Sequence, residues 1–235
     1  MVRTLLICCL LLHALSCGEL QGVVNKLPGE TGPVTTSEIA AGLRQALNLG
    51  IEKQVSKLAR TNGFFENQLV KILLPEELKK VESTLRDIGL DDLADEGLKL
   101  LNRAAEDAVG TATPIFVDAI KGITFRDARE ILLGNDQAAT EYLRQATQRQ
   151  LYDRFQPIIR NSFEKVGADQ VWTNIINRYN AVPFTNDVNP DLTDYVTLEA
   201  LDGVFTMIAV EEKEIRNSFS SRTTDLLKKV FALQD

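Results

Sequence analysis

Apolar residues recur every three or four positions along nearly the whole chain, and this spacing limits the possible folds more than any other feature. The first series follows Thr35 and Glu38, which have the spacing of a capping box. Its members are Ile39, Leu43, Leu47, Ile51, Val55 and Leu58. Because an α-helix has 3.6 residues per turn, side chains at these intervals form one stripe along one face. The series therefore predicts an amphipathic helix that buries this stripe against other helices.

Similar series follow one another down the chain and are separated by glycine, proline or capping residues. Glycine and proline number only 14 and 7 of 235 residues, which favours long, uninterrupted elements. We expect an all-α fold, with about nine or ten helices in one compact domain over residues 35–235. The exception is a short extended segment near residues 69–74, where Val70, Ile72 and Leu74 alternate with other residues.

The first eighteen residues have the order of a secretory signal peptide. Arg3 gives a basic start, residues 5–12 form an unbroken apolar run, and small residues follow up to Gly18. The apolar run is too short to cross a bilayer, and no later run reaches that length, so no transmembrane segment is predicted. We expect cleavage after Gly18, a flexible linker over residues 19–34, and a secreted, extracellular protein.

Cleavage after Ser16 is the alternative to this processing. Cys17 would then be the first residue, and the protein would be a lipid-anchored bacterial envelope lipoprotein. The residues before this cysteine read Ala14-Leu15-Ser16, whereas a lipobox normally has leucine in the first of these places. The sequence therefore favours secretion over lipidation.

The chain's cysteines and its single histidine all lie within the signal or at its edge. They are Cys8, Cys9, Cys17 and His13. Removing 18 of the 235 residues leaves 217 without cysteine or histidine. This composition excludes a Ser-His-Asp triad, a Cys-His nucleophile, Cys/His zinc sites and His- or Cys-ligated haem. No catalytic, cofactor-binding or metal-binding residue is assigned, and no cofactor is expected.

Acidic residues outnumber basic ones, and this balance bears on the partners. The net charge of the whole chain is −7, and it becomes −8 without Arg3, the only charged residue of the signal. A negatively charged protein repels nucleic acid, so no nucleic-acid partner is expected.

Seven stretches of the chain carry a resemblance to a known family. They are GLRQALNLGIEKQVSKL from Gly42, VKILLPEELKKVESTLRDIGL from Val70, LNRAAEDA from Leu101, PIFVDAI from Pro114, AATEYLRQAT from Ala138, YVTLEALDGVFTMIAVEEKEIR from Tyr195 and RTTDLLKKVF from Arg222. In this order they resemble domain-of-unknown-function family 4197, whose members are mostly bacterial, exported and often lipid-anchored helical proteins. The resemblance implies an all-helical exported domain. It brings no activity and no site residues.

Two polar constellations are candidate sites. Asn102, Arg103 and Glu106 lie on one predicted helix, and Asn102 and Glu106 are one turn apart. These residues suit either a small polar site or an interhelical hydrogen-bond network, and the network is the favoured interpretation.

The second constellation is Arg222, Thr223 and Thr224 at the start of the last helix, followed by Asp225. An arginine and two hydroxyls beside free N–H groups suit an anion. Ordinary helix capping is the favoured interpretation, because these residue types are typical of it.

An acidic run from Glu211 to Glu214, with Arg216 behind it, has the pattern of a solvated helix face. A carboxylate pair for hydrolysis stays open as the other interpretation.

The function that fits these observations best is that of a secreted, non-enzymatic helical domain. Its partner would be another protein, an extracellular-matrix component or a small apolar ligand. The alternative is a hydrolase without histidine or cysteine that uses carboxylate chemistry, so enzymatic activity stays open. A pocket with two facing carboxylates would favour the enzyme, whereas a packed core with exposed apolar surface would favour the binding domain.

Overall fold

The computed structural model describes residues 33–235 except for 88, 90, 167–171, 174–176 and 178–190. The predicted signal and nearly all of the predicted linker lie outside these residues. The chain divides into two compact units, Met1–Thr35 and Thr36–Asp235, and the second is described here by itself.

All regular structure in the described residues is helical, which confirms the predicted all-α class. The elements are α3 (Thr36–Leu58), α4 (Glu76–Asp87), α5 (Asp91–Val109), α6 (Thr113–Lys121), α7 (Phe125–Leu132), α8 (Ala138–Val166), α10 (Thr193–Asn217), the 3-10 helix η1 (Phe219–Ser221) and α11 (Asp225–Phe231). The expected nine or ten helices are one or two too many for the described residues, which hold eight α-helices.

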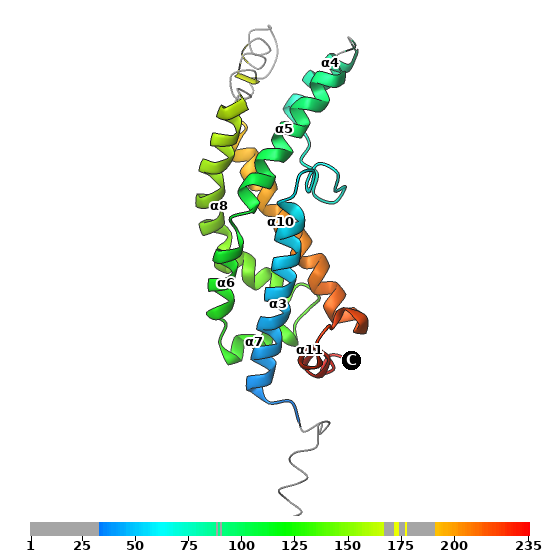
Figure 1. Ribbon diagram of the computed structural model, residues 1–235, viewed down its shortest axis with the longest axis vertical. Coiled ribbons are helices and arrows are strands. Elements are labelled where there is room, and N and C mark those ends of the chain that lie inside the picture. The colour runs from blue at the N-terminus through cyan, green and yellow to red at the C-terminus, as the bar shows by residue number, and fades with distance from the viewer. Residues whose placement is uncertain (1–32, 88, 90, 167–171, 174–176, 178–190) are drawn as a thin grey trace, which may run out of the picture. The chain divides into compact units, whose positions relative to one another are not determined.

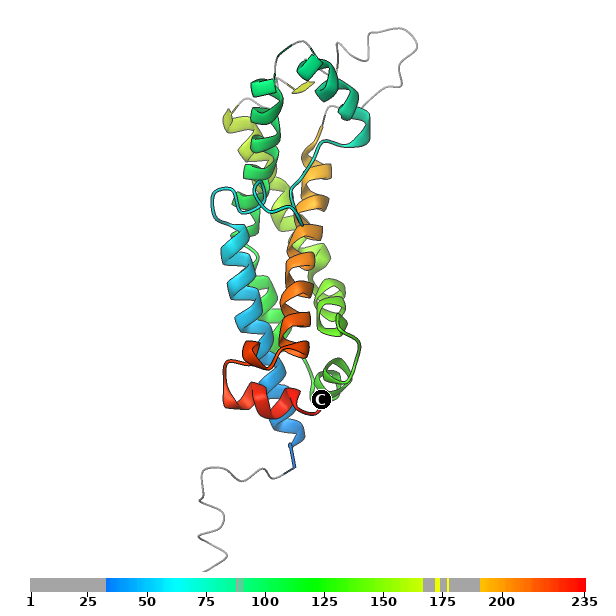
Figure 2. The same cartoon turned by 90° about the vertical axis from the view of Figure 1, so that its right-hand side faces the viewer.

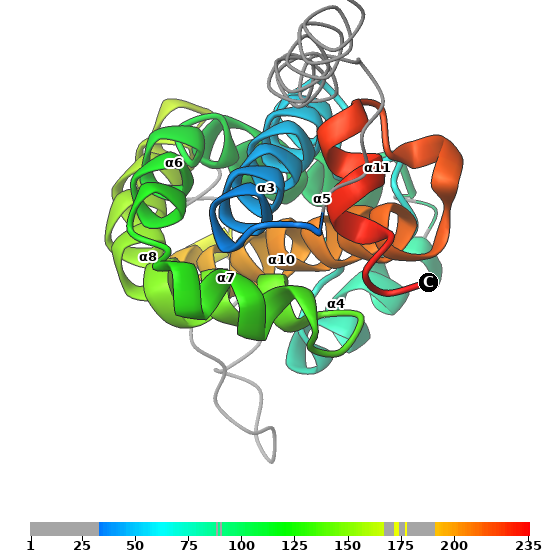
Figure 3. The same ribbon diagram turned by 90° about the horizontal axis from the view of Figure 1, so that it is seen from below.

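Helix α3 buries the stripe that its sequence predicts. Each of the six apolar residues of the stripe is buried, and none is more than 6% exposed. Helix α3 packs against α10, α7, α11 and α6. Figure 3 shows α3 with α6 and α11 on either side of it and α7 and α10 below it. The periodicity of α3 therefore creates the central contact surface of the helical unit.

Helices α5, α8 and α10 pack against one another in every pairwise combination. Figures 1 and 2 show α10 running alongside both α3 and α8, and α4 lying beside α5. Among the helices of the described residues, none combines the length and the apolar character needed to cross a lipid bilayer.

The predicted extended segment lies in the connector, which we define as residues 59–75 between α3 and α4. No strand forms there, and residues 71–75 have no regular secondary structure. Burial nevertheless alternates as the sequence predicts. Val70, Ile72 and Leu74 are buried, whereas Leu69 and Leu73 are exposed. The residues of the connector contact both α5 and α10, so it is an integral part of the core.

Candidate functional site

Asn102 lies on α5 and is fully buried. Its Nδ2 donates to the carbonyl oxygens of Ile72 and Leu98, each at 2.8 Å. Its Oδ1 accepts the N–H of Ile72, also at 2.8 Å. Both backbone groups of Ile72 thus have their partner in one side chain, and Asn102 fixes the connector to α5.

Glu106 lies one turn further along α5 and is also buried. It accepts the N–H of Phe64 at 3.2 Å, and Arg103 Nη1 lies 3.4 Å from its other oxygen. Arg103 is half exposed and forms a second ion pair with Asp107 at 2.9 Å. Asn102 and Glu106 therefore hold the connector against α5, while Arg103 pairs with Glu106 and Asp107 on the same helix.

Arg222 is buried at the corner between α10 and α11. Its guanidinium donates to the carbonyl oxygens of Ile215 and Arg216, at 3.1 and 2.7 Å, at the end of α10. It also forms two hydrogen bonds with the carboxylate of Asp235, which lower the pKa of that carboxyl. Arg222 thus satisfies the terminal carbonyls of α10, which have no partner within the helix.

The two threonines beside Arg222 have different surroundings. Thr224 is the N-cap of α11, and its hydroxyl accepts the N–H of Leu227 at 3.2 Å. Thr223 is exposed and lines a groove described below. The two constellations have different partners. Arg222 and Thr224 bind residues of α3, α10, α11 and the C-terminus, whereas Asn102 and Glu106 of α5 bind the connector.

The acidic run on α10 is a solvated face only in part, which corrects that interpretation: Lys213 and Glu214 are exposed as predicted, but the other members are not. Glu211, Glu212 and Arg216 are all buried. The two oxygens of Glu212 accept the N–H groups of Ala139 and Thr140 at 2.9 and 2.8 Å, and the Thr140 hydroxyl at 2.7 Å. A carboxylate at this position stabilises the positive, N-terminal end of α8.

Arg216 lies one turn after Glu212 and forms an ion pair with it at 2.7 Å. It also donates to the carbonyl oxygens of Ile131 and Leu132 at the end of α7, each at 2.9 Å. One buried ion pair on α10 therefore provides hydrogen-bond partners for carbonyl groups at the end of α7 and for N–H groups at the start of α8. No local signal in the sequence predicts this role, because an ion pair with the spacing of Glu212 and Arg216 also forms on exposed helix faces.

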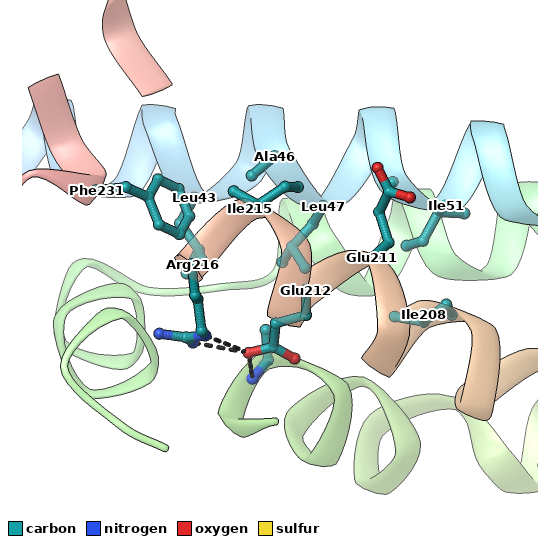
Figure 4. A pocket seen from close by; sticks show the side chains of 12 residues that line it. Leu43, Ala46, Leu47, Ile51, Ile208, Glu211, Glu212, Ile215, Arg216 and Phe231 are labelled. Carbon is teal, nitrogen blue, oxygen red and sulfur yellow. Dashed lines mark hydrogen bonds and ion pairs between the residues drawn. The ribbon is translucent and has the colours of Figure 1, made fainter. Parts of the chain in front are cut away.

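Figure 4 shows a small cavity between α3 and α10 that both acidic side chains approach. Its volume is about 20 Å³, enough for about one water molecule. In this view the carboxylate of Glu212 points toward Arg216, whereas that of Glu211 points away toward α3. Adjacent in sequence, the two carboxylates diverge and do not face each other.

Glu211 and Ile215 also line a larger groove, with a volume of about 540 Å³. We call it the Glu211 groove. Its walls come from α3, α10, η1 and α11. Its charged lining consists of Glu52, Lys53 and Glu211. Hydroxyls of Ser220, Ser221 and Thr223 and apolar side chains of Leu49, Ile215 and Leu227 form the rest.

Glu211 has two side-chain partners on α3. Lys53 Nζ lies 2.7 and 2.8 Å from the two carboxylate oxygens, and Gln54 Nε2 lies 2.6 Å from one of them. The sequence singled out Thr223 of this groove but gave no signal for Lys53, which lies on a different helix. Within the described residues, no group of three or more acidic, histidine or cysteine side chains is placed to hold a metal ion.

Comparison with known proteins gives the family of the chain. A family model described as a protein of unknown function (DUF4197) matches residues 33–232, a range that contains every helix from α3 to α11. No curated protein and no solved structure matches the chain. The family match covers most of the sequence and agrees with the resemblance carried by the seven stretches. The chain therefore belongs to the DUF4197 family of proteins of unknown function.

Proposed function

We propose that this protein is an exported, non-enzymatic helical domain that binds a small ligand in the Glu211 groove. The observation that carries the proposal is the contrast between this groove and the other buried polar groups. Glu106, Glu212, Arg216 and Arg222 are bonded to backbone groups that hold the fold together. The Glu211 carboxylate instead lies at a groove, beside an exposed lysine.

The size and lining of the groove favour a small molecule over a macromolecular partner. Ligand sites in proteins are commonly concave, about 300–1,000 Å³ in volume, and mostly apolar with a few polar groups. The Glu211 groove, at about 540 Å³, lies in this range and has both kinds of lining. A protein or matrix partner is therefore the second choice.

The groove proposal is tested by a ligand-observed NMR screen of a fragment library against residues 19–235. Thr223→Trp places a large side chain at the groove and should abolish the binding of its fragments. Gln148→Trp, at an exposed position on α8, adds the same side chain elsewhere and should leave binding intact. If no fragment distinguishes the two variants, the groove is not a ligand site.

The hydrolase interpretation requires two carboxylates that face a common substrate. Glu52 and Glu211 both line the groove, but Glu211 is already paired with Lys53 and Gln54. A screen of chromogenic glycoside and ester substrates tests this interpretation. If the wild type turns over a substrate and Glu211→Gln does not, an enzymatic function replaces the binding proposal.

Export is supported by the signal-type order of residues 1–18 and by the resemblance to an exported family. The expected mature protein begins at Glu19 and carries neither cysteine nor lipid. The intact mass of the protein recovered from a secreting host checks this. A mass that corresponds to a diacylated Cys17 would show a lipid-anchored envelope protein instead.

A further inference from the structure

We propose that the ligand of the Glu211 groove is an organic cation, an ammonium group on an apolar body, and that its ammonium replaces Lys53 at Glu211. This inference rests on the proposed binding function and specifies its ligand class. Three properties of the groove carry it: a fixed carboxylate, a weakly held counter-ion, and a lining that combines negative charge with apolar surface.

The Glu211 carboxylate is held in place before any ligand arrives. Its side chain is only 10% exposed, and it accepts a hydrogen bond of 2.6 Å from Gln54, whose exposure is 4%. A Cβ added at Gly50 would lie 3.2 Å from Glu211 Cγ, so α3 packs closely against the side chain. Binding groups that are already positioned lose little freedom when the ligand binds.

Lys53, in contrast, is an exchangeable counter-ion. Its ammonium lies 2.7 Å from Glu211, but its side chain is 59% exposed. The exposed lysine holds its place weakly, because water competes for its ammonium and its long side chain loses freedom in the pair. Lys53 can therefore turn into solvent when another ammonium takes its place.

The remaining lining selects for a cation with an apolar part. Glu52 adds a second carboxylate, so the charged residues of the groove have a net charge of −1 with Lys53 in place. Leu49, Ile215 and Leu227 offer apolar surface for the body of the ligand. An anionic ligand would meet two carboxylates, and this repulsion excludes carboxylates and phosphates as the preferred class.

The test compares three probes of the same chain length: hexylammonium, hexanol and hexanoate. Each is titrated into 15N-labelled protein, and the amide signals of Ser220, Ser221 and Leu227 report on the groove. Hexylammonium should shift these signals in a saturable manner. Hexanol should bind at least tenfold more weakly, and hexanoate should not bind.

Variants then assign the interaction to Glu211. Glu211→Gln should weaken hexylammonium binding at least tenfold, and Thr223→Trp should abolish it. Lys53→Ala should strengthen binding several-fold, because the competing ammonium is gone. Lys57→Ala, which removes an exposed charge one turn away on α3, is the matched control and should change the affinity little.

Three results would overturn the inference, and they differ in what they say of the groove. If Thr223→Trp abolishes the binding of hexanol or fragments while Glu211→Gln leaves hexylammonium affinity unchanged, the groove binds ligands of another class. If no probe or fragment shifts the groove signals, both this inference and the proposed function fail. Equal hexylammonium affinity in wild type, Glu211→Gln and Thr223→Trp would place the cation elsewhere and would also overturn the inference.

Discussion

The side-chain amide of Asn102 forms hydrogen bonds of 2.8 Å with both the N–H and the carbonyl oxygen of Ile72, thirty positions earlier in the chain. This is the pairing that a neighbouring β-strand would offer. Buried backbone groups need partners, and the connector meets this need without a sheet because one amide carries both a donor and an acceptor.

Replacement of Asn102 by alanine should therefore destabilise the protein strongly. Both buried backbone groups of Ile72 lose their partner, and an unsatisfied buried group costs about 1–3 kcal/mol. We expect the free energy of unfolding to fall by about 2–4 kcal/mol in urea titrations. Hydrogen exchange at the Ile72 amide should also accelerate. Arg103→Ala, at the half-exposed neighbour, should have a much smaller effect, and an equal effect would contradict this role of Asn102.

Because the Glu212–Arg216 pair is buried, mutation of Glu212 should destabilise the protein far more than mutation of an exposed ion pair. Glu212→Gln leaves the guanidinium of Arg216 buried without a counter-charge, and loss of one partner of such a pair costs about 3–5 kcal/mol. Lys121→Ala removes an exposed pair with Asp118 and should change little. Thermal unfolding of both variants checks the contrast. A small shift for Glu212→Gln would show that water reaches the pair.

Helix α11 is docked into the fold through apolar residues that share one face of the helix. Leu227, Val230 and Phe231 are buried, and a Cβ added at Gly42 of α3 would collide with Val230. Phe231→Ala should cost about 3–5 kcal/mol and lower the melting temperature by several degrees. Lys228→Ala, on the exposed side, should change it little. Equal, negligible shifts would mean that α11 is undocked in solution.

Two carboxyl groups should give opposite pH dependences of stability. Partial desolvation, with a smaller contribution from Asp202, raises the pKa of Glu199, although the residue remains exposed to solvent. Folding therefore favours its protonated form, and the associated stability is lost as the pH rises through the raised pKa. Glu199→Gln should consequently stabilise the protein at pH 7, and the gain should vanish as the pH falls below the ordinary glutamate pKa of about 4.3.

Asp127 is the counterpart. Hydrogen bonds from the backbone N–H and the hydroxyl of Thr124, in the capping box of α7, lower its pKa. Its contribution to stability is present above the unfolded pKa and is lost as the pH falls through the lowered one. Asp127→Asn should therefore destabilise the protein at pH 7, and the loss should shrink on acidification. Melting curves between pH 7 and pH 3 compare both variants, and shifts of the same sign would refute the assignment.

The helices were largely predictable, and the reason is local. The stripe of α3 follows from spacings of three and four residues, and the same spacing places Leu227, Val230 and Phe231 on one face of α11. The alternation of the connector was visible too, although no strand forms in the described residues. Neighbours in sequence fix these features, so no knowledge of distant contacts is needed.

The roles of the polar residues were less predictable. The sequence singled out Asn102 and Glu106 as polar residues one turn apart on a helix, and Arg222 beside the start of the last helix. It placed Glu211 and Glu212 on a solvated face, although both are buried.

By itself, the sequence determined the all-α class, the absence of cysteine and histidine after Cys17, and the faces of the helices that carry apolar stripes. The tertiary structure alone decided which charges are buried and which border a groove. Lys53 and Glu211 are 158 positions apart, and Glu212 and Thr140 are 72 apart. Helix formation depends on interactions within one or two turns, whereas the burial of a charge depends on which distant elements supply its hydrogen bonds.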